Sequence, residues 1–230
     1  NDNYEYERKD MTYDARNRTT HSNTINYDDD GAIIDQQIAD TLEFDIRGNA
    51  LYEKMETLVE AVDDKGDRIP GKMEQMSLSF TYNSDFDGRD NAHTSTTESY
   101  TFNPDKKAYE ADSKSETSVA VFDQYGNPLK QTVVTKSAQL DAKFDVVLTG
   151  AAGKPGTTGE PVWENVDRTD TTNTTANLAG VGPFMKTNDF IMGTPTQSET
   201  LTSTYDPAMA QFVPSDLKIS TVTARDAKGN

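Results

Sequence analysis

Polar and apolar residues alternate along several stretches of the chain, as they do in a β-strand that buries only one of its faces. In the clearest stretch, residues 76–82, Met, Leu, Phe and Tyr alternate with Ser and Thr. Weaker alternation covers residues 38–44 and 217–223, and residues 144–148 form an apolar run typical of a more buried strand. These patterns predict a protein built mainly from β-strands.

Residues 50–64 fit two structures. Their Leu, Met and Val side chains recur at helical spacing, and Gly66 follows as a candidate C-cap of an amphipathic helix. Turn-forming phrases flank the segment on both sides, however, and such phrases connect the strands of hairpins. We therefore predict one long strand here.

A short phrase recurs between the predicted strands: an aromatic or apolar residue, an Asp, two spacers, and then Gly-Asn or a close equivalent. The clearest copies are residues 44–49 (FDIRGN), 122–127 (FDQYGN) and 225–230 (RDAKGN). Looser copies are centred on Asp14, Asp28, Asp63, Asp87, Asn103 and Asp206. Gly and Asn adopt positive φ at low cost, so each phrase predicts a tight hairpin turn.

The phrase assigns a role to two of its residues. Its Asp is expected to accept hydrogen bonds from backbone N–H groups of the turn. Its aromatic residue is expected to point into an interface between sheets, at Tyr13, Tyr27, Phe44, Phe122 and Tyr205. Because one strand-turn unit cannot bury its apolar face alone, such units must stack on their neighbours.

The predicted fold is all-β, with antiparallel hairpin repeats that form an elongated β-solenoid or spiral sheet; tandem β-sandwiches are the alternative. We expect a β-repeat region over residues 1–148, a Gly-, Thr- and Asp-rich insertion or loosely ordered β region over 149–200, and a resumed repeat over 201–230 that stops within a turn. Within the middle region, residues 149–161 and 166–178 have the composition of loops. The chain starts without Met and ends in a turn phrase, so we expect a segment of a longer polypeptide.

Composition changes the picture of the core. Only 33% of the 230 residues are hydrophobic, while Asp, Asn, Thr, Ser and Gly are abundant. This predicts thin β structure with much exposed polar surface rather than a thick core. The 10 Tyr and 9 Phe residues argue against a disordered chain.

Charge and cysteine content exclude several classes of function. The net charge of −17 makes nucleic-acid binding unfavourable, because phosphate groups would be repelled. No apolar run approaches the ~20 residues that span a bilayer, and we expect no direct membrane insertion. The chain contains no Cys, which excludes disulfides and thiolate metal sites. An acidic, Cys-free β protein of this kind suits the extracellular space or the cell surface.

The phrases at residues 13–18, 44–49 and 122–127 resemble those of the YD-repeat proteins, a group that includes Rhs elements, toxin-complex shells and teneurin-type barrels. Residues 48–51 (GNAL) and 126–129 (GNPL) are similar to variant tandem forms found in very large bacterial surface proteins. The resemblance implies antiparallel hairpins wound into a long spiral sheet that encloses a cargo or forms a fibre.

The chain also departs from the YD pattern. The likeness is fair over residues 11–130 and weaker after them, the repeat length drifts, and Gly-Asn mostly replaces the familiar Gly-Arg. Residues 118–128 are similar to the strand-turn phrase of flagellar hook proteins, and residues 222–230 to the opening of an invasin-type Ig-like repeat.

Residues 83–91 contain the best candidate for a metal site. The candidate ligands are Asn83, Asp85, Asp87 and Asp90. Side-chain oxygens at alternate positions before a glycine are the arrangement by which a short loop wraps Ca²⁺. The bidentate Glu of an EF-hand is absent, with Thr94 in its position, and an Asx-rich hairpin turn explains the same residues without a metal.

No other constellation points to catalysis or to a cofactor. His21 and His93 lie in polar stretches without partners for a triad or a zinc site, and we expect both to face solvent. Residues 150–154 (GAAGK) lack the first Gly and the Ser or Thr of a phosphate-binding loop. Trp163 is explained by packing beneath a Gly-rich loop. We expect no enzyme, and no cofactor apart from Ca²⁺ at the candidate site.

The function that these features favour is a structural, self-associating segment of a large extracellular repeat protein, which forms a fibre, sheath or shell. Its partners would be copies of itself or neighbouring repeat segments, with an enclosed cargo or a host surface as further candidates. One alternative is a Ca²⁺-assisted adhesin or binding module of β-sandwich type, whose loops at residues 83–93 and 149–175 recognise a glycan or a protein. The other is a flagellar hook-like assembly subunit.

Overall fold

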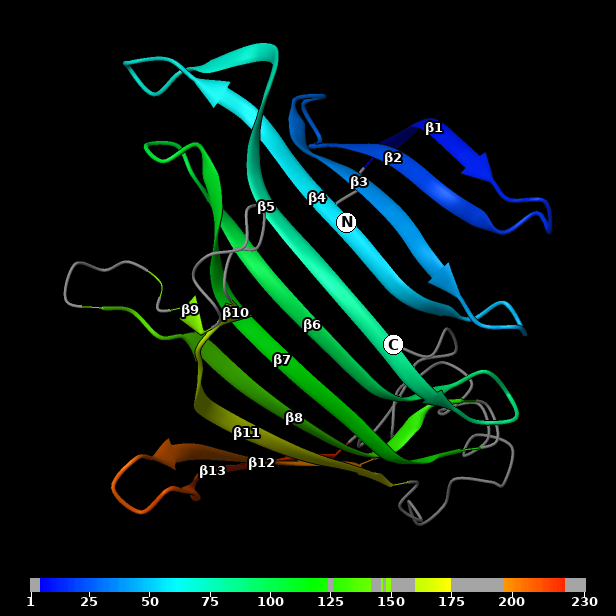
Figure 1. Cartoon of the computed structure of the whole chain (residues 1–230), viewed down its shortest axis with the longest axis vertical. Coiled ribbons are helices and arrows are strands. Elements are labelled where there is room, and N and C mark those ends of the chain that lie inside the picture. The colour runs from blue at the N-terminus through cyan, green and yellow to red at the C-terminus, as the bar shows by residue number, and fades with distance from the viewer. Residues whose placement is uncertain are drawn as a thin grey trace. The chain divides into compact units, whose positions relative to one another are not determined.

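The computed structural model of the chain describes residues 5–123, 126–141, 146, 148–149, 160–174 and 197–221, and within these ranges it is all-β, without a helix. Eleven strands form one sheet in the order β1-β2-β3-β4-β5-β6-β7-β8-β11-β12-β13 (Figure 1). They are β1 (Glu5–Tyr13), β2 (Thr19–Tyr27), β3 (Ile33–Phe44), β4 (Ala50–Val62), β5 (Arg68–Phe86), β6 (Ala92–Asn103), β7 (Ala108–Phe122), β8 (Pro128–Ala138), β11 (Trp163–Thr174), β12 (Gln197–Asp206) and β13 (Gln211–Thr221). A second sheet pairs β9 (Leu148–Thr149) with β10 (Glu160–Pro161). The all-β prediction is confirmed.

The chain folds into two compact units, each of which combines separate segments of the sequence. Unit 1 comprises residues 1–83, 96–114 and 138–163, and unit 2 comprises residues 84–95, 115–137 and 164–230. The three regions predicted from the sequence (1–148, 149–200 and 201–230) are continuous stretches, whereas these units are defined by contacts. The predicted division stays a prediction.

The ambiguous segment is a strand, as predicted. Residues 50–62 form β4, which pairs antiparallel with β3 on one side and with β5 on the other. A strand in this position satisfies its backbone N–H and C=O groups on both edges. The two flanking turns therefore decide the structure against the helical spacing of the apolar residues.

Six hairpins are closed by the same five-residue turn. The turns begin at Asp14, Asp28, Asp45, Asp63, Asp87 and Asp123, and in each the Asp N–H donates to the carbonyl four residues later. In every one, Oδ1 of the Asp accepts the N–H of that fourth residue at 2.8–3.0 Å. The third residue after the Asp has a positive φ in all six, and it is Gly in four of them. The predicted role of the Asp is confirmed.

Two phrases that the sequence groups with these turns form a different one. After Asn103 and after Asp206 the chain makes a four-residue connection that begins with proline, and positive φ falls on its last residue, Lys107 or Ala210. The Asx side chain accepts two N–H bonds within the turn in each case. An aromatic pair flanks both turns, Phe102–Tyr109 and Tyr205–Phe212, each with ring centroids 5.3 Å apart and tilted edge to face. In both turns a proline, Pro104 or Pro207, follows the Asx residue and fixes φ at the second position of the turn.

The aromatic residues of the phrase were expected between sheets, and this is corrected. Phe44 lies under the guanidinium of Arg18, with Cζ 4.0 Å from the ring centroid. Phe122 packs edge to face against His93 at 5.0 Å. Tyr13 is 51% exposed. These rings contact side chains of the same sheet, because the described part of the chain has no second large sheet to face.

The predicted loop at residues 166–178 is also corrected over its described part. Residues 166–174 belong to β11, which pairs with β12 through register partners such as Thr169 with Thr202 and Thr171 with Thr200. β-branched Thr favours strands despite its polarity, and facing Thr residues pack well across a ladder. Composition typical of a loop was therefore misleading here.

The prediction of thin structure agrees with the burial of the described residues. Only Ala61, Val119 and Ser203 are buried among them. Several predictions lie outside the described residues: the turn at 225–230, most of the run at 144–148 and most of the loop at 149–161.

Candidate ligand groove

One face of strands β4 to β7 in unit 1 is rich in aromatic rings. Tyr52 stacks on Tyr82 with centroids 4.5 Å apart and an interplanar angle of 10°. Phe80 lies 5.8 Å from Tyr52 and 5.9 Å from Tyr100, edge to face with the latter. Register explains the cluster, because Tyr52 pairs with Tyr82 and residues two apart share a face.

Tyr109 extends this face by reaching across the sheet. Its hydroxyl donates to Glu56 Oε1 at 2.8 Å, although Tyr109 lies on β7 and Glu56 on β4. Gln75 Nε2 donates to the same carboxylate oxygen at 3.2 Å. Glu56 thus ties together three strands of unit 1.

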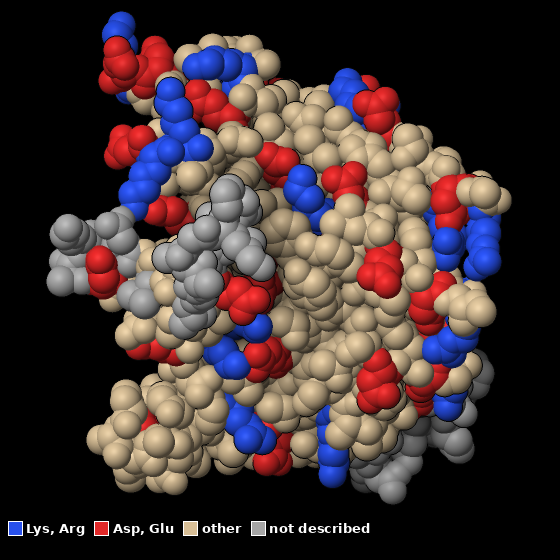
Figure 2. All heavy atoms as spheres, in the orientation of Figure 1, with Lys and Arg blue, Asp and Glu red and all other residues tan. Residues whose placement is uncertain are grey.

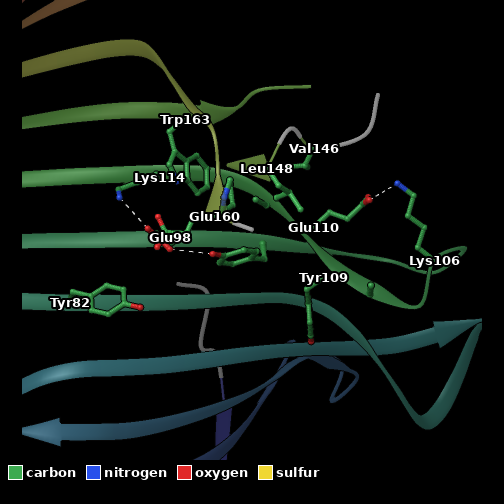
Figure 3. A pocket seen from close by; sticks show the side chains of 14 residues that line it. Tyr82, Glu98, Lys106, Tyr109, Glu110, Lys114, Val146, Leu148, Glu160 and Trp163 are labelled. Carbon is green, nitrogen blue, oxygen red and sulfur yellow. Dashed lines mark hydrogen bonds and ion pairs between the residues drawn. The ribbon is translucent and has the colours of Figure 1, made fainter. Parts of the chain in front are cut away.

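A groove of about 760 Å³ opens beside these rings, entirely within unit 1. On the sheet side it is lined from β5 to β7 and their connecting turn by Tyr82, Glu98, Tyr100, Lys106, Ala108, Tyr109, Glu110, Ala111 and Lys114. On the opposite side it is lined by Val146, Leu148, Glu160, Pro161 and Trp163 (Figure 3). The volume falls within the range of small-molecule sites in proteins.

Charged side chains in the groove form ion pairs. Lys114 Nζ lies 3.1 Å from Glu98 Oε1, and Lys106 Nζ lies 2.6 Å from Glu110 Oε1 (Figure 3). The second oxygen of Glu98 accepts the hydroxyl of Tyr100 at 3.1 Å. The groove therefore combines apolar surface with two ion pairs and with a third carboxylate, that of Glu160.

The tyrosines of the groove stay protonated well into the alkaline range. Burial, followed by the Glu98 carboxylate, raises the pKa of Tyr100 to about 12. Burial also raises the pKa of Tyr82, with its hydrogen bond to Tyr52 as the next cause. Burial and the hydrogen bond to Glu56 raise the pKa of Tyr109. At neutral pH all three hydroxyls can donate hydrogen bonds.

The residues predicted to bind Ca²⁺ are Asn83, Asp85, Asp87 and Asp90, of which the first belongs to unit 1 and the others to unit 2. Asp87 braces its turn, accepting the N–H groups of Arg89 and Asn91 on Oδ1. The Asn91 side-chain amide also donates to this carboxylate and is the largest cause that lowers the pKa of Asp87, to about 2; the two backbone N–H groups add to the effect. Asn83 donates to the carbonyl of Ala50 at 3.2 Å. In the described ranges no three His, Cys, Asp or Glu residues are grouped to hold a metal ion, and Ca²⁺ binding stays a prediction.

The two histidines lie on strands and are half-buried rather than solvent-facing. His21 Nδ1 lies 2.6 Å from Asp40 Oδ1, across the β2–β3 pair. His93 Nδ1 contacts the carbonyl of Val119. Each histidine thus has a structural partner.

The sequence interpretation missed the groove, and it treated Trp163 as simple packing. The sequence did contain a signal for the aromatic side of the groove, because the turn at residues 87–91 fixes which residues of β5 and β6 face each other. The Thr81 and Thr97 hydroxyls lie 3.1 Å apart across this hairpin. Alternation then places the aromatic side chains of β5 and the Glu98–Tyr100 stretch together on the other face. The contribution of Val146, Leu148, Glu160, Pro161 and Trp163 had no local signal.

Acidic and basic side chains are interspersed on the face seen in Figure 2, where the described residues gather no continuous region of one sign. Among the described residues, no helix is long and apolar enough to cross a bilayer.

No family model matches the sequence, and a search of curated proteins finds no significant similarity. Among solved structures, the chain is similar to a protein of unknown function from Bacteroides fragilis, with 7% sequence identity and a TM-score of 0.42. That likeness covers 95% of this chain and 94% of the other, and it is too low to carry a conclusion about fold or function.

Proposed function

We propose that this chain is a non-catalytic structural segment of a large, YD-like β-repeat protein, and that it associates with copies of itself or with neighbouring repeat segments. The observation that carries the proposal is the exposed apolar face of the β12–β13 hairpin in unit 2. Leu217 and Ile219 are each 54% exposed there. Large apolar residues gathered on an edge strand favour association.

The register of this hairpin places most of its apolar residues on one face, and Val213, paired with Thr204, lies on the other. Leu217 pairs with Leu201, and Phe212 pairs with Tyr205, so each pair projects from the same side of the sheet. Ile219 follows Leu217 by two residues and shares that side. The opposite side carries polar residues, among them Lys218 and Ser220.

The strand order adds a second line of support. β13 is the last strand of the sheet, and within the described residues it pairs with β12 alone. Part of its outer edge can therefore accept another strand. Pro214 lacks an N–H and limits pairing near the turn, which leaves residues 215–221 as the segment suited to association.

The repeated turns and the thin sheet support an extended assembly. Six hairpins share one turn, and very few described residues are buried. Units of this kind gain stability from stacking on further units. In the proposed assembly the hairpins continue from segment to segment as an elongated spiral sheet or β-solenoid, which forms a fibre, sheath or shell outside the cell or on its surface.

Sedimentation velocity over a wide concentration range tests the proposal. We expect the wild-type chain to form larger species as concentration rises, and Leu217→Lys combined with Ile219→Lys to remain monomeric. Ser220→Lys is the control for an added lysine, because it places one on the opposite face of the same strand. Monomers in the wild type at all concentrations, or equal association of wild type and double variant, would overturn the proposal.

A further inference from the structure

We propose that the groove of unit 1 binds a neutral oligosaccharide. Trp163 and Tyr100 supply aromatic surface, and the Glu98–Lys114 ion pair supplies hydrogen bonds to the ligand's hydroxyl groups. This inference concerns a different part of the chain from the association surface of β12–β13, and neither depends on the other.

The aromatic lining suits sugar rings. Trp163 lies across the groove from the tyrosines of β5 to β7, and pairs of flat apolar surfaces of this kind can contact the C–H faces of a pyranose (Figure 3). Tyr100 is held in place by its edge-to-face contact with Phe80 and by its hydrogen bond to Glu98. A ring fixed in advance loses little conformational entropy on binding.

The charges of the groove favour a ligand that is polar but uncharged. Glu98 pairs with Lys114 and Glu110 pairs with Lys106, while Glu160 is a third carboxylate in the lining. A lysine ammonium donates hydrogen bonds and a carboxylate accepts them, so a Lys–Glu pair presents both functions beside a ligand hydroxyl. A saccharide hydroxyl both donates and accepts, and it can therefore satisfy either partner.

Other ligand classes fit these residues less well. An acyl chain would bury two ion pairs without giving them new hydrogen bonds, which is costly. A strongly anionic ligand would face the carboxylates of Glu98, Glu110 and Glu160. A neutral oligosaccharide avoids both penalties.

The chain offers a built-in reporter of binding, because Trp163 is its only tryptophan. The intrinsic fluorescence of the whole chain is followed during titration with four neutral probes: cellohexaose, maltohexaose, mannohexaose and chitohexaose. Hexagalacturonate and oleate serve as anionic and acyl probes. We expect a saturable change in Trp163 emission with at least one neutral probe.

Variants then assign the response to the groove. Tyr100→Ala is expected to weaken binding about tenfold or more. Tyr100→Phe keeps the ring against Phe80 and loses only the hydroxyl, so it is expected to lose less. Lys114→Met removes the ammonium of the ion pair with Glu98 and is also expected to weaken binding. Circular dichroism checks that each variant is folded. Tyr13→Ala is the matched control, because Tyr13 is an exposed tyrosine of the same unit that does not line the groove.

Two sets of results would overturn the inference. One is the absence of a saturable change with all four neutral probes, or a response to oleate or hexagalacturonate alone. The other is unchanged affinity in both folded variants, Tyr100→Ala and Lys114→Met. Failure to associate in sedimentation would not affect this inference, and lack of oligosaccharide binding would not affect the proposed assembly.

Discussion

The hairpins β3–β4 in unit 1 and β12–β13 in unit 2 are both antiparallel pairs closed by an Asx side chain, yet their surroundings differ. Strand β4 pairs on both edges, and Phe44 beside its turn lies under Arg18 of another turn. Strand β13 pairs on one edge within the described residues, and its Leu217 and Ile219 remain more than half exposed.

Turn chemistry and packing are separate contributions to the stability of these two hairpins. Asp45 accepts three N–H groups on Oδ1 and the Asn49 amide on Oδ2, which closes a hairpin without any apolar contact. Asp206 accepts two N–H groups, and the Tyr205–Phe212 pair completes that turn. A hairpin can therefore be closed locally and still leave an apolar face for a partner.

Hydrogen exchange gives the largest contrast between the two hairpins. Amides of β4 are expected to be protected at least about tenfold more than those of β13 in dilute protein, because opening β4 breaks two ladders. As the protein concentration rises, protection should increase in residues 215–221 and stay constant in residues 50–62. Protection of β13 that does not depend on concentration would contradict the proposed association.

Removal of the aromatic partner should affect the two hairpins differently. Phe212→Ala breaks the edge-to-face pair with Tyr205, and we expect it to lower the free energy of unfolding by about 2 kcal/mol. Phe44→Ala also removes a ring, but the turn beside it keeps the four hydrogen bonds of Asp45. Urea unfolding monitored by circular dichroism measures both, and a larger loss for Phe44→Ala would count against the comparison.

Removal of the Asx side chain should show the reverse order. Asp45→Ala loses four hydrogen bonds and Asp206→Ala loses two, so the first should cost roughly twice as much unfolding free energy as the second. Asp45→Asn is the matched control, since its remaining carbonyl oxygen can still accept backbone N–H groups. Equal losses for the two alanine variants would show that the rings, not the carboxylate, close both turns.

Acid should weaken the Asp-braced turns selectively. The side-chain bonds of Arg18 hold the pKa of Asp14 at about 2, and those of Asn91 hold the pKa of Asp87 at about 2, below the ordinary value of 3.8. The unfolded chain binds these protons first, so the stabilisation is complete above about pH 4 and is lost as the pH falls toward about 2. Asp87→Asn should flatten that pH dependence in urea unfolding, and an unchanged slope would contradict the assigned role.

The sequence was sufficient for the elements whose information is local. The recurring turn phrases predicted six turns, because the required positive φ and the hydrogen bonds of the Asp lie within five residues. The same phrases also led to the correct prediction that residues 50–62 form a strand. Composition misled at residues 166–174, where Thr pairs across a ladder rather than forming a loop. The groove was not predicted, because Trp163 and Leu148 approach β5 to β7 only through contacts distant in sequence.

Negative-stain electron microscopy of the 230-residue chain tests whether β12–β13 is an association surface. If β12–β13 is an association surface, the wild type and Ser220→Lys form regular filaments or shells, and the variant with Leu217→Lys and Ile219→Lys forms discrete single particles. Discrete particles in all three samples, or the same filaments in all three, would contradict it.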